Sequence, residues 1–77
     1  MIELTRKQAN VFEFIREFIK EESMPPTRQE IASNFGWWPN AAEVHVRALI
    51  RKGALESSAK HRGIKPVKNI RYKVRER

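Results

Sequence analysis

Residues 27–53 have the sequence TRQEIASNFGWWPNAAEVHVRALIRKG, in which two short helical patterns flank an aromatic turn. Thr27 and Glu30 have the spacing of a capping box, in which the side chain of each residue accepts the backbone amide hydrogen of the other. A helix is therefore expected to begin at Thr27. Gly36 is expected to end it after about two turns, because glycine tolerates the positive φ of a helix C-terminus.

The second helical pattern follows Trp37, Trp38 and Pro39, which interrupt the first. Asn40 is expected to cap this second helix through its side-chain oxygen, and Gly53 is expected to end it. Apolar residues recur at helical spacing and are expected to face inward: Ala42, Val46, Leu49 and Ile50. Two short helices joined by a tight turn predict a helix-turn-helix.

The opposite face of the second helix carries amide, carboxylate, guanidinium and small apolar groups. Groups of these kinds can contact base edges in the major groove of DNA. We predict base recognition by Asn40, Ala41, Glu43 and Val44. An exposed apolar side chain at position 44 can contact a thymine methyl group, whereas the alternative is that Val44 packs beneath Trp37 or Trp38.

Cationic and helix-terminal groups around this face are expected to hold the DNA backbone. Thr27 and Arg28 begin the first helix of the motif, where free amides and the helix dipole attract a phosphate. Backbone contacts that position the domain are also expected from Arg47, Arg51, Lys60 and Arg62.

A longer helix is expected ahead of this motif. Thr5 and Gln8 repeat the capping-box spacing, and the apolar pattern continues to about Glu22. Its apolar stripe is interpreted as core and not as a ligand site: Val11, Phe12, Ile15, Phe18 and Ile19, with Phe14 at the edge. Residues 24–26, Met-Pro-Pro, then break the helix, because proline lacks an amide hydrogen and disfavours α geometry in the preceding residue.

Strand patterns follow the second helix of the motif. Residues 54–58 and 63–67 are expected to form a hairpin, and the tip between them carries Lys60, His61 and Arg62. Such a hairpin beside a helix-turn-helix is called a wing, and its tip can reach phosphates or a minor groove. The predicted fold is mainly α with a small β-hairpin: a winged helix-turn-helix of three helices plus an antiparallel wing.

Length and composition limit the possible classes. With 77 residues, 40% of them hydrophobic, the chain is expected to form one domain, residues 1–67, followed by a basic C-terminal tail, residues 68–77. The sequence contains no cysteine, which excludes a disulfide framework, a zinc finger and a thiol nucleophile. We expect a cytoplasmic, nucleoid-associated protein, because no apolar run is long enough for a membrane span and the N-terminus lacks a signal-peptide pattern.

The net charge of +7 is unevenly distributed. Residues 1–59 contain eight Lys or Arg and eight Glu, whereas residues 60–77 contain the other eight Lys or Arg and a single acid, Glu76. Electrostatic contacts between the tail and nucleic acid are predicted for Lys68, Arg71, Lys73 and Arg75. A merely solubilising tail is the alternative. Apolar residues alternate with these cations, so the tail could form a third, half-buried strand, but we expect a flexible end with partial strand character.

Enzyme or metal chemistry is not expected. His45 and His61 are accompanied by no cysteine and no convergent histidine or aspartate, so neither a metal site nor a cofactor is predicted. Ser57 and Ser58 lack a triad-like pattern of partners, and the sequence contains no glycine-rich phosphate loop.

Several segments resemble the N-terminal DNA-binding domain of the LexA repressor family. The similar segments are LTRKQANVFEFIREFI, MPPTRQEIA, PNAAEVHVRALIRKGALE and RGI, which extend from about Leu4 to Ile64. The resemblance implies a winged helix-turn-helix that binds operator DNA as a transcriptional repressor or regulator. It also implies that Asn40, Ala41 and Glu43 are the recognition residues.

Three features differ from the pattern of that family. The turn formed by Gly36, Trp37, Trp38 and Pro39 is one residue shorter, and Trp38 occupies the position of a small hydroxyl residue that contacts DNA, so Trp38 is placed among the backbone contacts. Val44 stands where the family commonly has a second acidic residue. The sequence stops before a self-cleaving serine–lysine protease domain, which also supplies the dimer interface of the family.

Double-stranded DNA is the expected partner. We expect a monomer in solution, because no dimerisation domain is appended, and pairing, where it occurs, on DNA. The alternative function is a protein-binding module, such as an antirepressor or a modulator of another regulator, with Trp37 or Trp38 at the centre of its interface. Two large aromatic side chains in one tight turn are difficult to bury together in a small domain, so one is expected to pack and the other to be exposed.

Overall fold

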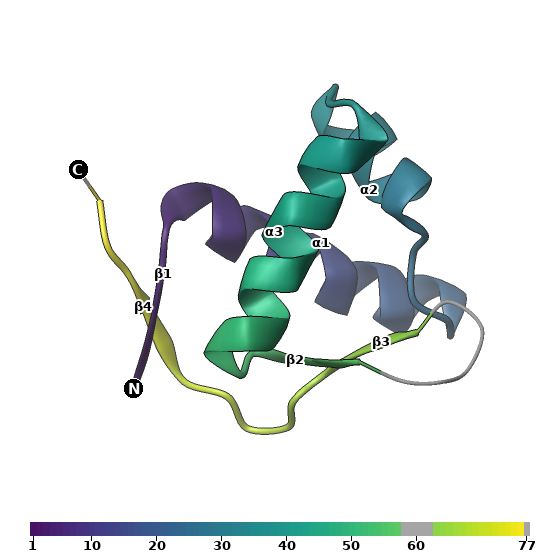
Figure 1. The fold of residues 1–77 in the computed structure, drawn as a ribbon. Helices are drawn as coiled ribbons and strands as arrows, with labels where there is room; N and C mark the ends of the chain where they lie inside the picture. Colours follow the sequence, from purple (N-terminus) through teal and green to yellow (C-terminus); the bar gives the residue numbers. More distant parts are fainter. Residues whose placement is uncertain (58–62, 77) are drawn as a thin grey trace.

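Helices dominate the part of the chain that the structure, a computed structural model, describes: residues 1–57 and 63–76. In chain order its elements are β1 (Ile2–Leu4), α1 (Arg6–Glu22), α2 (Arg28–Phe35), α3 (Pro39–Lys52), β2 (Leu55–Ser57), β3 (Ile64–Pro66) and β4 (Tyr72–Val74). Figure 1 shows α3 in front of α1, with α2 beside the N-terminal half of α3, the hairpin of β2 and β3 below its C-terminal end, and β1 beside β4 on the left.

The first two helices begin where their capping boxes predict. The Gln8 amide donates to Thr5 Oγ1 at 3.1 Å, and the Thr5 amide donates to Gln8 Oε1 at 3.0 Å. The Glu30 amide donates to Thr27 Oγ1 at 3.0 Å, and the Thr27 amide donates to Glu30 Oε1 at 2.7 Å. Both predicted starts are confirmed, with each threonine as the capping residue just outside its helix.

Glycine ends α2 and α3 as the sequence predicts. Gly36 has a φ of 71° and Gly53 a φ of 88°, both in the left-handed region. A side chain at either position would be strained in this conformation. These two glycines therefore fix the length of each helix of the motif.

The start of α3 differs from the expectation. Pro39 is its first helical residue, and the capping residue Trp38 makes no side-chain cap bond. Proline is favoured at this position because its fixed φ suits a helix and its missing amide hydrogen would have no partner there. The predicted cap at Asn40 is therefore wrong, and the exposed side chain of Asn40 lies in the first turn.

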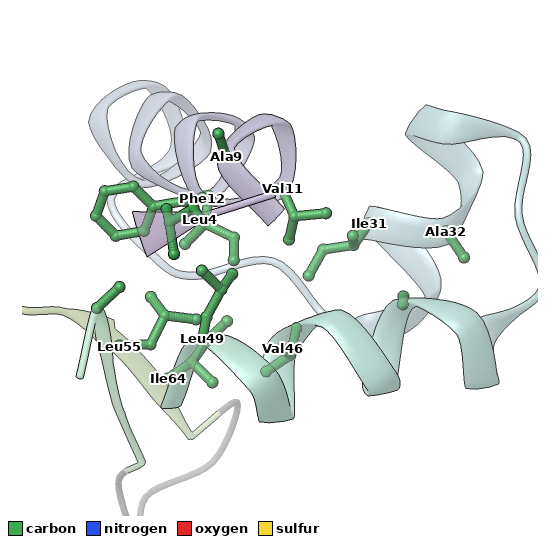
Figure 2. Packing of buried hydrophobic residues seen from close by; sticks show 13 residues of the cluster. Leu4, Ala9, Val11, Phe12, Ile31, Ala32, Val46, Leu49, Leu55 and Ile64 are labelled. Carbon is green, nitrogen blue, oxygen red and sulfur yellow. The ribbon is translucent and has the colours of Figure 1, made fainter. Parts of the chain in front are cut away.

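Apolar side chains from the three helices and from β1, β2 and β3 form one core (Figure 2). Phe12 of α1, Ile31 of α2 and Leu49 of α3 are fully buried. The predicted inward positions of α3 are confirmed for Ala42, Val46 and Leu49, whereas Ile50 is half-buried. In the α1 stripe, the buried residues are Val11, Phe12 and Ile15, and the half-buried ones are Phe14, Phe18 and Ile19.

The predicted wing is confirmed as an antiparallel hairpin. Leu55 of β2 pairs with Pro66 of β3, and Ser57 pairs with Ile64. Leu55 and Ile64 are buried, so the hairpin is attached to the core at the C-terminal end of α3. The predicted contacts at the tip, Lys60, His61 and Arg62, lie outside the described residues.

A second, parallel pair of strands was not predicted. The Ile2 amide of β1 donates to the Arg71 carbonyl at 3.1 Å, and the Arg75 amide donates to the Leu4 carbonyl of β1 at 2.8 Å. The apolar residues of this segment, Ile70, Tyr72 and Val74, pack against the core. The expected flexible end is therefore wrong for residues 72–74, which form the half-buried strand that the alternation allowed.

Tyr72 attaches β4 to α1. Its ring meets the Phe12 ring edge to face, with 5.7 Å between the centroids. Its hydroxyl donates to Glu13 Oε2 at 2.6 Å. This hydrogen bond raises the pKa of Tyr72 above its usual 10.0, because the ionised phenolate could not donate to the carboxylate.

Candidate nucleic-acid interface

The outer face of α3 carries the residues predicted to recognise bases. Asn40 and Val44 are exposed, and Ala41 and Glu43 are half-buried. Ala42, on the inner face between them, is fully buried in the core. An α-helix with one face free has the width that the major groove of B-DNA admits. The structure therefore brings the four predicted residues together on the first turns of one helix.

Glu43 lies between two arginines. Its Oε1 accepts a hydrogen bond from Arg28 Nε at 2.6 Å, and its Oε2 is 3.2 Å from Arg47 Nε. Because Arg28 belongs to α2, the shorter contact links the two helices of the motif. The Arg28 and Glu43 side chains are 31% and 40% exposed, whereas Arg47 is 73% exposed, so water screens the Arg28 pair less.

Thr27 presents its hydroxyl at the N-terminal end of α2. The hydroxyl oxygen accepts from the Glu30 amide, but a hydroxyl also carries one hydrogen that it can donate. Together with the Arg28 guanidinium and the positive end of the helix dipole, this hydrogen suits a phosphate. The backbone contact at Thr27 and Arg28 has the required donors and stays a prediction.

The two tryptophans of the turn have different environments. Trp37 stacks on Phe35, with ring centroids 4.7 Å apart and an interplanar angle of 20°, and its ring lies 5.0 Å from that of His45. Trp38 is 80% exposed at the start of α3. The expectation that one tryptophan packs and the other is exposed is therefore confirmed.

Val44 is 63% exposed on the outer face of α3. The alternative in which it packs beneath Trp37 or Trp38 is therefore wrong. An exposed β-branched side chain here adds apolar area to a face that is otherwise polar, and an apolar base feature such as the thymine methyl group suits it.

The cations beyond the base-contacting residues extend this surface. Arg51 is exposed near the C-terminal end of α3. Of the tail cations, Lys73 Nζ lies 3.5 Å and Arg75 Nη1 3.1 Å from the two carboxylate oxygens of Glu3. The hydrogen bond from Arg75, with help from Lys73, lowers the pKa of Glu3 below its usual 4.5. Two of the four tail cations thus have a carboxylate partner in the fold, and Lys68 and Arg71 are exposed.

His45 is half-buried against Trp37, and burial together with the charge of Lys7 lowers its pKa. Within residues 1–57 and 63–76, no group of three or more His, Asp or Glu side chains is placed to hold a metal ion. None of the helices in these ranges is long and apolar enough to cross a membrane.

Two features of this surface were missed by sequence reasoning. The first is the contact between Arg28 and Glu43, which depends on how α2 crosses α3. The second is Lys52, whose Nζ donates to the Glu3 carbonyl at 2.9 Å and to Gln8 Oε1 at 2.7 Å. Both join residues far apart in the sequence, so no local pattern indicates them.

A helix-turn-helix with a free outer helix, an attached wing and basic flanks defines a winged helix-turn-helix domain. The family model described as LexA DNA binding domain matches residues 1–63. The chain belongs to this family.

Similar curated proteins agree with this assignment. The LexA repressor of Marinomonas sp. (strain MWYL1) is 55% identical over 69 residues, which cover 87% of this chain and 33% of that protein. The LexA repressor of Sodalis glossinidius (strain morsitans) is 55% identical over 64 residues, 80% of this chain and 32% of the relative. The LexA repressor of Burkholderia mallei (strain NCTC 10229) is 53% identical over 60 residues, covering 77% and 28%. The chain thus spans about a third of the length of these relatives.

Proposed function

We propose that this protein binds double-stranded DNA sequence-specifically and acts as a transcriptional repressor or regulator. The observation that carries the proposal is the outer face of α3, where Asn40, Ala41, Glu43 and Val44 stand clear of the core beside Arg28 of α2. The membership of the chain in the LexA DNA binding domain family supports it. The name of the relatives, LexA repressor, supports the regulatory role. Such a protein would act on the nucleoid, in the cytoplasm.

Each recognition residue suits a particular base feature in the major groove. The Asn40 amide can form two hydrogen bonds to adenine, and the Glu43 carboxylate can accept one from cytosine N4. Val44 and Ala41 can contact thymine methyl groups. The proposed site therefore combines hydrogen-bonding and apolar recognition within the first turns of α3.

Backbone contacts would set the register of α3 in the groove. We assign them to Thr27, Arg28, Trp38, Arg47 and Arg51 around α3, to Lys60 and Arg62 at the tip of the wing, and to the tail cations Lys68, Arg71, Lys73 and Arg75. The protein would be monomeric in solution and could pair on DNA. In that case the bound sequence would be palindromic, with half-sites spaced by whole helical turns.

Selection of bound sequences from a pool of random duplexes tests the proposal. We expect enrichment of one motif, and a palindromic motif would show pairing on DNA. Recovery of unrelated sequences only, with no protected region in a footprint of an enriched duplex, would contradict sequence-specific binding.

The exposed Trp38 favours a second candidate, a protein-binding module. Trp38 alone is 80% exposed, so the interface would be centred on one tryptophan, because Trp37 packs on Phe35. Exposed tryptophans are frequent at the energetic centres of protein interfaces. Trp38→Ala separates the two candidates. In the DNA-binding function it weakens duplex binding, whereas in the alternative it abolishes capture of a specific protein and leaves any duplex binding unchanged.

A further inference from the structure

We propose that Glu43 is a positioning residue that makes the phosphate contacts of Arg28 and Arg47 conditional on a matching base. In the free protein its carboxylate would hold both guanidinium groups and reduce their attraction to phosphate. On the correct sequence a base donor would compete for the carboxylate and release them. This inference rests on the proposed DNA binding and adds to it a source of discrimination against non-specific DNA.

The geometry of the cluster supports this role. One carboxylate oxygen of Glu43 faces each arginine, at 2.6 Å for Arg28 and 3.2 Å for Arg47. The three side chains together carry a single positive charge where the two arginines alone would carry two. The Arg28 contact, short and about two-thirds shielded from solvent, is the one that competes most strongly with a phosphate.

The position of the cluster on the fold makes the competition possible. Glu43 lies one residue before the exposed Val44 and on the side of α3 that meets α2. A base edge that reaches Val44 is within one residue of Glu43. A cytosine amino group there can donate to the carboxylate, and the two arginines are then free to contact phosphates. Base recognition and backbone binding would thereby strengthen each other.

Glu43→Gln tests this coupling, because glutamine keeps the shape of the side chain and removes its charge. Glu17→Gln is the matched control, since Glu17 is exposed on α1 and the charge change is identical. The affinity of the whole chain is measured for a mixed-sequence duplex and for the selected sequence, at salt concentrations from about 50 to 200 mM. Melting temperatures of the variants verify that each is folded.

We expect Glu43→Gln to raise the affinity for the mixed-sequence duplex by about threefold to tenfold, the range that one partly shielded ion pair can account for. The slope of log K against log salt should become steeper by up to about 1.8, because two arginines become available and each neutralised phosphate contributes about 0.9. The affinity for the selected sequence should not rise. The ratio of specific to non-specific affinity should therefore fall at least as much as the non-specific affinity rises.

A double-mutant cycle shows whether the effect passes through the arginines. In a background of Arg28→Ala with Arg47→Ala, Glu43→Gln should change non-specific affinity no more than Glu17→Gln does. Equal gains from Glu43→Gln and Glu17→Gln in the otherwise unchanged protein would overturn the proposal and indicate a general charge effect. So would unchanged non-specific affinity together with a lost base preference, which would make Glu43 a base reader only. If the unchanged protein selects no sequence at all, the proposed function itself fails, which is distinguishable from both outcomes.

Discussion

The same arrangement of charge occurs twice in this protein, with different surroundings. Glu43 lies between Arg28 and Arg47 on the α2–α3 surface, and Glu3 lies between Lys73 and Arg75 on the β1–β4 surface. The Glu3 cluster accompanies a strand pairing, whose backbone hydrogen bonds and packed apolar side chains fix the two segments independently of charge. The Glu43 cluster lies on the free face of α3.

This difference indicates what each carboxylate can control. On the β1–β4 surface, removal of the charge leaves the strand pairing and the Tyr72 contacts in place, so the effect on structure should be small. On the α2–α3 surface, the arginines have phosphate as a competing partner, so removal of the charge should change binding. Packing therefore decides whether a carboxylate with two cations stabilises the fold or regulates a contact.

Tyr72→Ala is expected to have the largest effect, because it removes the packing that holds β4 to α1. We expect a loss of about 2–3 kcal/mol of unfolding free energy from the lost aromatic contact and the lost hydrogen bond to Glu13. Base preference in selected-site sequencing should not change, since Tyr72 lies away from the outer face of α3. Thermal or denaturant unfolding measures the first effect.

Arg71→Ala is the control for this prediction, because Arg71 is exposed beside β4 and its replacement should change stability by no more than about 0.5 kcal/mol. Equal stability of Tyr72→Ala and the unchanged protein would show that β4 contributes nothing to the fold, and the comparison between the two surfaces would lose its structural half.

The sequence predicts the local features of the fold well. The capping boxes at Thr5 and Thr27 and the glycine at position 53 act within a few residues, so their patterns locate the helix ends directly. The wrong cap at Asn40 is also local, since Pro39 competes for the same helix start and its preference for the first helical position was not weighed.

Features that join distant residues were not predictable in the same way. β1 has only three residues, and its partner β4 lies at the other end of the chain, so neither strand has a pattern that names the other. The contact between Arg28 and Glu43 likewise requires the crossing of α2 over α3. For the candidate site, the outer residues of α3 follow from helical spacing alone, but the ionic partner that each of them has does not.

Val44→Glu sharpens the comparison on the α2–α3 surface by placing a second carboxylate beside Glu43. We expect preference at one base pair per half-site to move from T·A toward C·G, with a change in discrimination of about 1–3 kcal/mol. Stability should change by no more than about 0.5 kcal/mol, because the side chain is 63% exposed. Selected-site sequencing and a melting curve of the same variant measure both effects.

Val44→Ala provides the control, since it should weaken the preference for T·A without creating one for C·G. A large loss of stability in Val44→Glu with unaltered base preference would remove Val44 from the recognition residues.

Lys73→Gln combined with Arg75→Gln tests whether the cations of the Glu3 cluster also contact DNA. If both reach phosphates, the slope of log K against log salt should become shallower by about 1.8, and base preference should remain the same. Lys20→Gln, at the last turn of α1, should leave the slope unchanged. An unchanged slope in the double variant would restrict Lys73 and Arg75 to the structural role of pairing with Glu3.

The pH dependence of stability provides the smallest of these effects and isolates the charge of Glu3 from the strand pairing around it. Arg75 and Lys73 hold the pKa of Glu3 below its usual 4.5 in the folded protein, so the folded state binds the proton less tightly than the unfolded state does. The stabilisation is therefore fully present above pH 4.5 and is lost as the pH falls through the lowered pKa. Glu3→Gln should reduce the melting temperature slightly at pH 7, and the difference from the unchanged protein should disappear at the acid end of the range. Glu17→Gln, measured over the same pH range, controls for the change in net charge. A difference that persists undiminished at the lowest pH would mean that the side chain of Glu3 stabilises β1 and β4 through its shape and not through its charge.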